Sequence, residues 1–217
     1  MAANEVRIIS GNWKGRKLRF PSLPGLRPTL GRVRETLFNW LQAEIAGRHV
    51  LDCFAGSGAL AFEALSRGAA SATLIDANRS AAGALRDNAE RLGVTLRPIG
   101  ATAARSVDGP VLTVVCSPIA RFLDRVRPDG PGWDLVFLDP PFGSGLLADT
   151  LARLRQHPGL SREALIYVEA DKAAAIDFSG FETMRETTAG DTRSRLLCLA
   201  SPDSDRYHPA GRWGEEA

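Results

Sequence analysis

The chain has little cysteine and little histidine, with only three residues of each type among 217. The cysteines, Cys53, Cys116 and Cys198, lie in or near apolar runs, and an odd number cannot pair completely. This argues against a disulfide framework and predicts reduced core thiols, as is typical of a cytoplasmic protein. The histidines lie far apart in the sequence, so no group of Cys and His has the spacing of metal ligands. We therefore expect no bound metal.

The chain also lacks long hydrophobic runs and repeats. No apolar segment is long enough to cross a bilayer, and the first residues do not resemble a secretory signal. There is no internal repeat and no low-complexity tract. With 217 residues, 44% of them hydrophobic and 24% charged, the sequence predicts one globular α/β domain with a modest appendage. We expect a cytoplasmic monomer without a membrane partner.

Positive charge is concentrated near the N-terminus, although the whole chain has a net charge of only +2. Residues 1–48 hold nine Lys and Arg against three Glu, a local net charge of +6, whereas the remainder has a net charge of −4. A basic segment beside a mildly acidic body predicts a polyanionic partner for that segment. An ordinary solvated basic face is the alternative.

The first part of this basic segment has the pattern of a β-hairpin. Residues 6–10 and 16–20 alternate apolar and polar side chains on either side of a turn at 11–15. Cations on the polar positions can bind RNA phosphates. Trp13, at the tip, can stack on a base or pack on its own scaffold.

A helix is predicted from an N-cap at Thr29 to about Ala46. Arginines cluster near its start, where they can bind RNA or lie beside the next loop. One of them, Arg34, can instead form an ordinary surface pair with Glu35. The predicted RNA contacts of the whole basic segment are Arg7, Trp13, Arg16, Lys17, Arg27, Arg32 and Arg34.

A strand, a glycine turn and a helix follow, and they form the central motif of the chain. An apolar run ends at Asp52, breaks at Gly56-Ser57-Gly58 and resumes with helical spacing over 59–67. Such a corner binds nucleotides, because glycines admit a ligand close to the backbone and helix amides face it. Asp76 lies 20 residues after Gly56, behind a second apolar run. Its carboxylate can accept hydrogen bonds from both hydroxyls of a ribose.

Asp52 distinguishes between two nucleotide ligands. A dinucleotide would bring a pyrophosphate to the glycine turn, and a carboxylate beside it would be repulsive. S-adenosylmethionine instead brings a sulfonium and an ammonium, which Asp52 can hold directly or through water. The sequence therefore favours S-adenosylmethionine. The alternative is that Asp52 only caps the turn.

Asp139-Pro140-Pro141-Phe142 is the second informative motif, because it ends an apolar strand predicted over 133–138. In a doubly wound sheet this strand and the Asp52 strand flank the crevice that binds ligands. Asp139 and the Pro140 carbonyl can each accept one N–H of an exocyclic amine, and Phe142 can stack on the base. The motif thus predicts amino-group methylation by positioning, with no need for a metal. A structural turn is the alternative.

The remaining pattern alternates strands and helices, which predicts a parallel, doubly wound sheet. Segment 95–110 has little periodicity, and it predicts a short extra strand or a loose loop. The last two strands, predicted over 181–187 and 193–200, favour an antiparallel edge. The further predicted strands are 71–76, 111–116 and 164–169, and the further helices are 79–92, 119–126 and 146–156.

Four segments together resemble one known family, the bacterial 16S ribosomal RNA guanine-N2 methyltransferases that act on guanine 966. These segments are 25–29, 32–41, 51–60 and 139–142. The resemblance implies S-adenosylmethionine as the cofactor and a Rossmann-like class I methyltransferase sheet of about seven strands, the last one antiparallel. It also implies action on 16S ribosomal RNA in the small subunit or its assembly intermediate. The family has Asn or Asp near the adenine where this chain has Pro118, so Ile119 is left to pack on the ring.

The complete prediction has three parts: a basic hairpin and helix at 1–48, a methyltransferase domain at 49–200 and a disordered tail at 201–217. The predicted catalytic residues are Asp139, Pro140 and Phe142. The predicted cofactor-binding residues are Asp52, Phe54, Gly56, Ser57, Gly58, Asp76 and Ile119. The rival functions are an adenine-N6 methyltransferase on DNA or RNA and a non-catalytic RNA-binding assembly factor. A nicotinamide oxidoreductase is disfavoured by Asp52.

Overall fold

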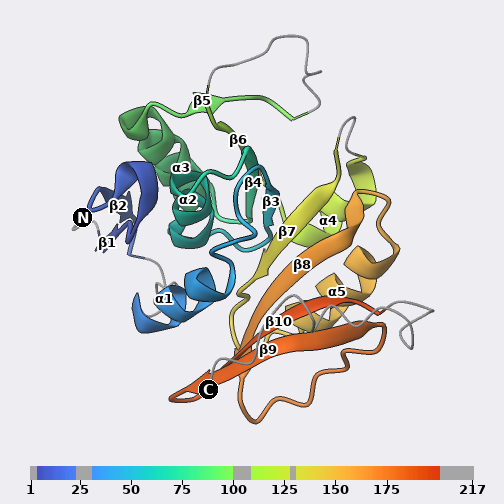
Figure 1. Ribbon diagram of the computed structural model, residues 1–217. Helices are drawn as coiled ribbons and strands as arrows, with labels where there is room; N and C mark the ends of the chain where they lie inside the picture. The colour runs from blue at the N-terminus through green and yellow to red at the C-terminus, as the bar shows by residue number, and fades with distance from the viewer. Residues whose placement is uncertain (1–3, 23–30, 100–108, 128–130, 201–217) are drawn as a thin grey trace.

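An eight-stranded, mostly parallel sheet forms the centre of the computed structural model (Figure 1). The structure describes residues 4–22, 31–99, 109–127 and 131–200. The predictions for Arg27, the Thr29 N-cap and the tail lie outside these residues. Along the sheet the strands are β5 (Thr95–Leu96), β6 (Val111–Cys116), β4 (Ser71–Asp76), β3 (His49–Asp52), β7 (Trp133–Leu138), β8 (Leu160–Asp171), β10 (Thr192–Leu199) and β9 (Phe181–Ala189).

Helices cover both faces of this sheet, because successive residues of each buried strand point to opposite sides. Val50, for example, faces one hydrophobic core and Leu51 the other. The first core is covered by α1 (Gly31–Trp40), α2 (Ala59–Ser66) and α3 (Arg79–Leu92); the second is covered by α4 (Ile119–Arg125) and α5 (Leu146–Gln156). The predicted doubly wound α/β class is confirmed.

The predicted N-terminal hairpin is present as β1 (Asn4–Arg7) and β2 (Lys17–Phe20), joined through a short 3-10 turn, η1 (Gly11–Trp13). The two strands form a separate antiparallel sheet. Their apolar side chains nevertheless join the first core, where Leu18 and Phe20 are almost fully buried against the helices of the larger domain. Figure 1 places the hairpin beside α2 and α3, on the opposite side of the sheet from α4 and α5.

Several predicted bounds differ from the structure by a few residues, as in β8, which was predicted over 164–169, and two predicted features are wrong. The helix α1 ends at Trp40 and is followed by turns, in which Glu44 N–H bonds to Leu41 C=O at 2.8 Å, so the predicted extension to Ala46 is wrong. The antiparallel strand β10 lies inside the sheet, between β8 and β9, so it is not the edge. Strand β10 is apolar and is buried at Leu196 and Leu197. Strand β9 is mostly polar, has no buried residue and forms the edge of the sheet.

Two further details complete the comparison. Segment 95–110 contributes the two-residue edge strand β5, as one of the two interpretations expected. Cys53 is buried, but Cys116 is exposed at the end of β6, so the prediction of three core thiols is wrong for Cys116. Within the described ranges, no helix is both long and apolar enough to cross a membrane.

Candidate active site

Four carboxyl side chains lie at the carboxyl ends of four neighbouring strands: Asp52, Asp76, Asp139 and Glu169. The strands occur in the order β4, β3, β7 and β8 and all run parallel. Leu138 pairs with Val168, so Asp139 and Glu169 are the next residues of two adjacent strands. Asp139 is close enough to Asp52 for its charge to raise the pKa of the Asp52 carboxyl group. This edge of the sheet is therefore a strongly acidic crevice.

The glycine turn between β3 and α2 lies at this edge and is held by Asp76. One carboxylate oxygen of Asp76 accepts the Gly56 N–H at 2.9 Å, and the other accepts the Asn78 N–H at 2.7 Å. Gly58 begins α2 with a φ of 76°, in the left-handed region. A methyl group there would lie 2.6 Å from Leu85 Cδ2, so the turn also needs glycine for space. Asp76, which was predicted to accept hydrogen bonds from a ribose, thus also holds the glycine turn in place.

Asp52 is 3% exposed and lies beneath this turn. Burial and the neighbouring charge of Asp139 raise the pKa of Asp52 to about 8, while backbone hydrogen bonds at Phe54 and Ala61 oppose the rise. A carboxyl group in this position favours a cationic neighbour, because a positive charge stabilises its ionised form. The backbone bonds also fit the alternative role of turn cap.

The raised pKa of Asp52 predicts how stability depends on pH. Between about pH 4 and pH 8 the folded state holds a proton on Asp52 that the unfolded state has lost, so stability falls as pH rises through this window. The Asp52→Asn variant has no carboxyl group that could ionise at this position. We expect the ligand-free variant to gain roughly 2–3 kcal/mol relative to wild type between pH 5 and pH 8. Urea unfolding at pH 5 and pH 8 measures the free energy of unfolding of each protein, and Asp87→Asn, a change at an exposed position, is the control. If wild type and both variants showed the same pH dependence of stability, the prediction would be contradicted.

The loop after β7 carries the predicted catalytic residues in three different environments. Asp139 is half-buried, Pro140 is buried and Phe142 is 48% exposed. Phe142 is one of only four large hydrophobic side chains that are exposed in the described residues. An exposed aromatic ring beside a half-buried carboxylate fits a planar ligand that carries hydrogen-bond donors on one edge.

Glu169 belongs to the site although the sequence interpretation missed it. It is 5% exposed at the end of β8 and accepts a hydrogen bond from the Tyr167 hydroxyl at 2.8 Å. Burial and the charge of Asp139 raise its pKa to about 8. The signal was in the sequence, because an apolar strand ends in a carboxyl residue here as it does at Asp52 and Asp139.

The other three predicted cofactor residues are buried or half-buried. Ser57 is buried, and its hydroxyl accepts the Ala59 N–H at 3.3 Å. Phe54 packs against the second core, where Ile119 is buried at the start of α4. In the parts of the chain that the structure describes, no group of three or more His, Cys, Asp or Glu is arranged to hold a metal.

The predicted RNA contacts on the hairpin are exposed but have local partners. Arg7 donates to the Gly15 carbonyl at 3.2 Å and Arg16 to the Arg91 carbonyl at 2.7 Å, while Lys17 pairs with Glu5. Arg32, on α1, is also exposed. Their charged groups lie at the surface, where they can reach a phosphate.

Trp13 and Arg34 are placed differently from these cations. Trp13 is half-buried against the first core, which is the scaffold-packing alternative, and its backbone N–H donates to the Ser66 hydroxyl at 2.9 Å. Arg34 is 5% exposed and donates to the Arg7 carbonyl at 3.1 Å. Burial lowers its pKa. The prediction of Arg34 as a surface cation, whether for RNA or for Glu35, is therefore wrong, because α1 packs this face against the hairpin.

The hairpin is attached to the glycine-turn helix by a second group that the sequence interpretation missed. Glu63, fully buried in α2, accepts the Ile9 N–H at 2.6 Å and the Ser10 N–H at 2.9 Å. It also pairs with Arg67 at 2.8 Å. One turn along, the Ser66 hydroxyl donates to the Ser10 carbonyl. Nothing in the spacing of Glu63 signals these contacts, because they cross more than 50 residues of chain.

This arrangement of parallel sheet, glycine turn and carboxylate edge is that of a nucleotide-binding α/β enzyme, and the solved structure of a putative methyltransferase, yhhF from Escherichia coli, has the same fold. The two chains are 40% identical with a TM-score of 0.71, and the match covers 90% of this chain and 98% of that one. The chain belongs to the family described as Conserved hypothetical protein 95, whose sequence profile matches residues 6–198.

Named relatives of this chain act on ribosomal RNA. Ribosomal RNA small subunit methyltransferase D of Escherichia coli strain K12 is 42% identical over 196 residues, which are 89% of this chain and 90% of that protein. The protein of the same name from Haemophilus influenzae is 39% identical over 196 residues, covering 90% of this chain and 94% of its own length. The resemblance stated from the sequence motifs is thereby confirmed.

Proposed function

We propose that this protein transfers a methyl group from S-adenosylmethionine to the exocyclic N2 amine of a guanine in 16S ribosomal RNA. The observation that carries the proposal is the position of the Asp139-Pro140-Pro141-Phe142 loop, which lies next to the buried carboxyl group of Asp52 at one edge of the sheet. An amine acceptor and a cationic methyl donor would meet at this edge. The names of the relatives support ribosomal RNA of the small subunit as the substrate.

The residues at this edge of the sheet fit S-adenosylmethionine, which supplies an electrophilic methyl group on a sulfonium. Asp52 would face the positive methionine end, where the carboxylate becomes the favoured form. Asp76 already accepts two backbone N–H groups and retains acceptor capacity for ribose hydroxyls. The positive φ of Gly56 and Gly58 gives the turn the backbone conformation of the predicted cofactor loop, and Ile119 and Phe54 supply apolar contacts.

The substrate amine would be oriented by the residues after β7. Asp139 accepts one N–H of the amine and the Pro140 carbonyl the other, which directs the nitrogen lone pair toward the methyl group. Phe142 stacks on the base. Methyl transfer then depends mainly on positioning and on the electrostatics of the crevice. The proton released from the methylated amine needs no strong base, because the amine is acidic once alkylated.

Two alternatives are less well supported. An adenine-N6 methyltransferase would use the same motif, but the related proteins are named for the small-subunit ribosomal RNA. A non-catalytic assembly factor would not need the carboxyl groups of Asp52, Asp76 and Asp139 at the strand ends. A protein that modifies ribosomal subunits would act in the cytoplasm, where bacteria assemble them.

Transfer of a labelled methyl group tests the proposal. S-adenosylmethionine carrying the label is offered with naked 16S RNA, with partial subunits and with whole small subunits, and calorimetry compares binding of S-adenosylmethionine and NAD. We expect S-adenosylmethionine to bind and at least one of the three RNA substrates to be labelled. Micromolar binding of NAD with no response to S-adenosylmethionine would contradict the proposal.

The hairpin cations predict a salt-dependent part of RNA binding. Changing Arg7, Arg16 and Lys17 to Gln removes three exposed charges, so the slope of log affinity against log salt should decrease by about 0.7–0.9 for each phosphate that is no longer neutralised. Stability should hold, since exposed cations contribute little to folding. RNA affinity across a salt series measures the effect, with S-adenosylmethionine affinity as the control. Parallel slopes with equal affinities would mean that these cations form only a solvated face.

A further inference from the structure

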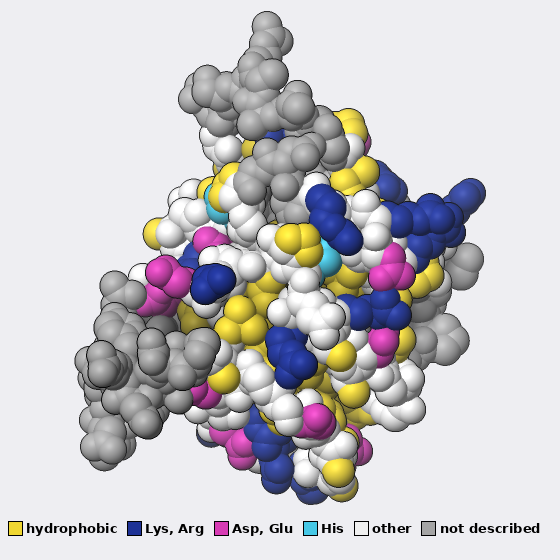
Figure 2. All heavy atoms as spheres, turned by 90° about the vertical axis from the view of Figure 1, so that its right-hand side faces the viewer, with side chains coloured by type: hydrophobic (Ala, Val, Ile, Leu, Met, Phe, Trp, Pro, Cys, Tyr) yellow, Lys and Arg dark blue, Asp and Glu magenta, His cyan; other side chains and the backbone are white. Residues whose placement is uncertain are grey.

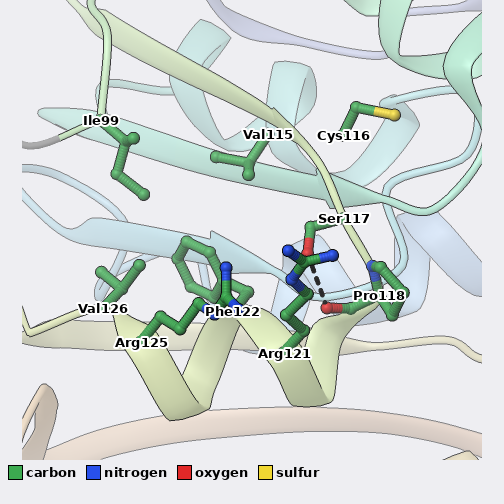
Figure 3. A pocket seen from close by; sticks show the side chains of 9 residues that line it. All are labelled: Ile99, Val115, Cys116, Ser117, Pro118, Arg121, Phe122, Arg125 and Val126. Atoms are coloured by element: carbon green, nitrogen blue, oxygen red, sulfur yellow. Dashed lines mark hydrogen bonds between the residues drawn. The ribbon is translucent and has the colours of Figure 1, made fainter.

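A cavity of about 350 Å³ lies between the end of β6 and α4, beside the crevice described above (Figure 3). Its rim includes Pro118, which directly precedes the predicted cofactor residue Ile119. Its walls are apolar and come from Val115 of β6, Phe122 of α4 and Ile99. Figure 3 shows Arg121 and Arg125 rising from α4 toward the space that these side chains enclose. The cavity thus combines an apolar interior with two guanidinium groups.

Arg121 and Arg125 form no hydrogen bond and no ion pair with the residues that the structure describes. They are four residues apart on one helix, so they lie on one face. The acidic residue between them, Asp124, pairs with Arg153 of α5 at 2.6 Å instead. None of the described residues that line the cavity is acidic. The two positive charges are therefore available to an anionic ligand.

The location of the cavity connects it to the acidic crevice. Cys116 is level with Asp76 in the sheet, and the Ser117 N–H bonds to the Asp76 carbonyl at 3.0 Å. The cavity therefore adjoins the carboxylate edge along the row of strand ends. On the face of the molecule that forms the right-hand side of Figure 1, basic, acidic and hydrophobic side chains are interspersed (Figure 2).

We propose that this cavity binds a nucleotide of the RNA substrate other than the methylated one, with its phosphate on Arg121 and Arg125 and its base against the apolar wall. The inference rests on the proposed function, since it requires an RNA substrate. Charge complementarity favours this occupant. The negative charge of the crevice repels phosphates, and Arg121 and Arg125 beside the crevice attract them. A neutral base can then enter the acidic crevice while the RNA backbone is held at its side.

The test separates the phosphate contact from the base contact. Binding of a naked 16S RNA transcript is measured from 50 to 200 mM salt for wild type, Arg121→Gln, Arg125→Gln and the double variant. For the double variant we expect the slope of log affinity against log salt to decrease by about 1.4. The ratio of wild-type to variant affinity should therefore fall about sevenfold between 50 and 200 mM salt. Ile99→Ser should weaken binding by a similar factor at every salt concentration, because it removes only apolar contact.

Arg162→Gln is the matched control, since Arg162 is an exposed arginine near the opposite end of the sheet, in the first part of β8. It should keep the wild-type slope, and all variants should keep the melting temperature and the S-adenosylmethionine affinity of wild type. Wild-type slope and affinity in the double variant would overturn the inference. Weakened S-adenosylmethionine binding would also overturn it, by assigning the cavity to the cofactor.

Two other outcomes are informative. A deficit with whole small subunits but not with naked RNA would assign the cavity to a protein of the subunit and overturn the inference. Wild-type affinity of Ile99→Ser at every salt concentration would overturn the claim that a base fills the cavity. Failure of the proposed function is distinguishable, because then the wild-type protein itself would methylate none of the RNA substrates.

Discussion

Asp139→Ala is expected to lower the rate of methyl transfer by at least about 10²-fold, with S-adenosylmethionine affinity nearly unchanged. The carboxylate is placed to orient the acceptor amine, so its loss should affect the chemical step and leave cofactor contacts intact. Removing the negative charge of Asp139 also lowers the pKa of Asp52, which burial and Asp139 together raise to about 8. Cofactor affinity should therefore shift only slightly near pH 8.

Single-turnover transfer with saturating cofactor measures this effect. Asp134→Ala is a suitable control, because Asp134 lies on the same strand, β7, but near its amino end, away from the site. The control should keep a wild-type rate once its fold is verified. If the Asp139 variant lost cofactor binding and kept a normal single-turnover rate, Asp139 would be a cofactor ligand and the assigned role would be wrong.

Glu63→Ala should cause a large loss of stability, about 3–5 kcal/mol. The change leaves the Ile9 and Ser10 N–H groups without their acceptor and removes the partner of Arg67. The buried guanidinium of Arg34 also loses the negative charge that stabilises it most. For a domain of this size the melting temperature should fall by roughly 2–4 °C for each kcal/mol.

Thermal unfolding and hydrogen exchange at Ile9 and Ser10 together measure this prediction. The amides of these two residues should exchange much faster in the variant, because the hairpin is held to α2 through Glu63. Glu90→Ala is the matched control, an exposed glutamate on α3 whose replacement should cost less than about 0.5 kcal/mol. A Glu63 variant that melts like this control would contradict the assigned role of the buried carboxylate.

The strands and helices that could be predicted from the sequence have sharp local signals. Strands 71–76, 111–116 and 133–138 and helices 79–92 and 146–156 have the predicted bounds, because apolar runs or periodic segments meet polar or glycine residues at each end. Gly93, for instance, ends α3 in the left-handed conformation that stops a helix. The convergence of Asp52 and Asp139 followed from the general topology of doubly wound sheets.

What could not be predicted depends on contacts between distant parts of the chain. Arg34 has the spacing of a surface residue, and only the packing of the hairpin on α1 buries it. Glu63 has the pattern of an ordinary helix residue, and its bonds to Ile9 and Ser10 exist only in the folded chain. The position of β10 inside the sheet depends on its pairing with β8 as well as with β9, a contact between distant segments that the sequence interpretation did not anticipate. The roles of the individual site residues stay predictions.

Identification of the methylated nucleoside tests the central claim most directly. Small ribosomal subunits or 16S RNA lacking the modification are incubated with the protein and labelled S-adenosylmethionine, digested to nucleosides and separated by mass. We expect the label in N2-methylguanosine, and at least about 10²-fold less of it in the same time when Asp139→Ala replaces the wild-type protein. Label in N6-methyladenosine, or no label in any RNA nucleoside while the cofactor binds, would contradict the account.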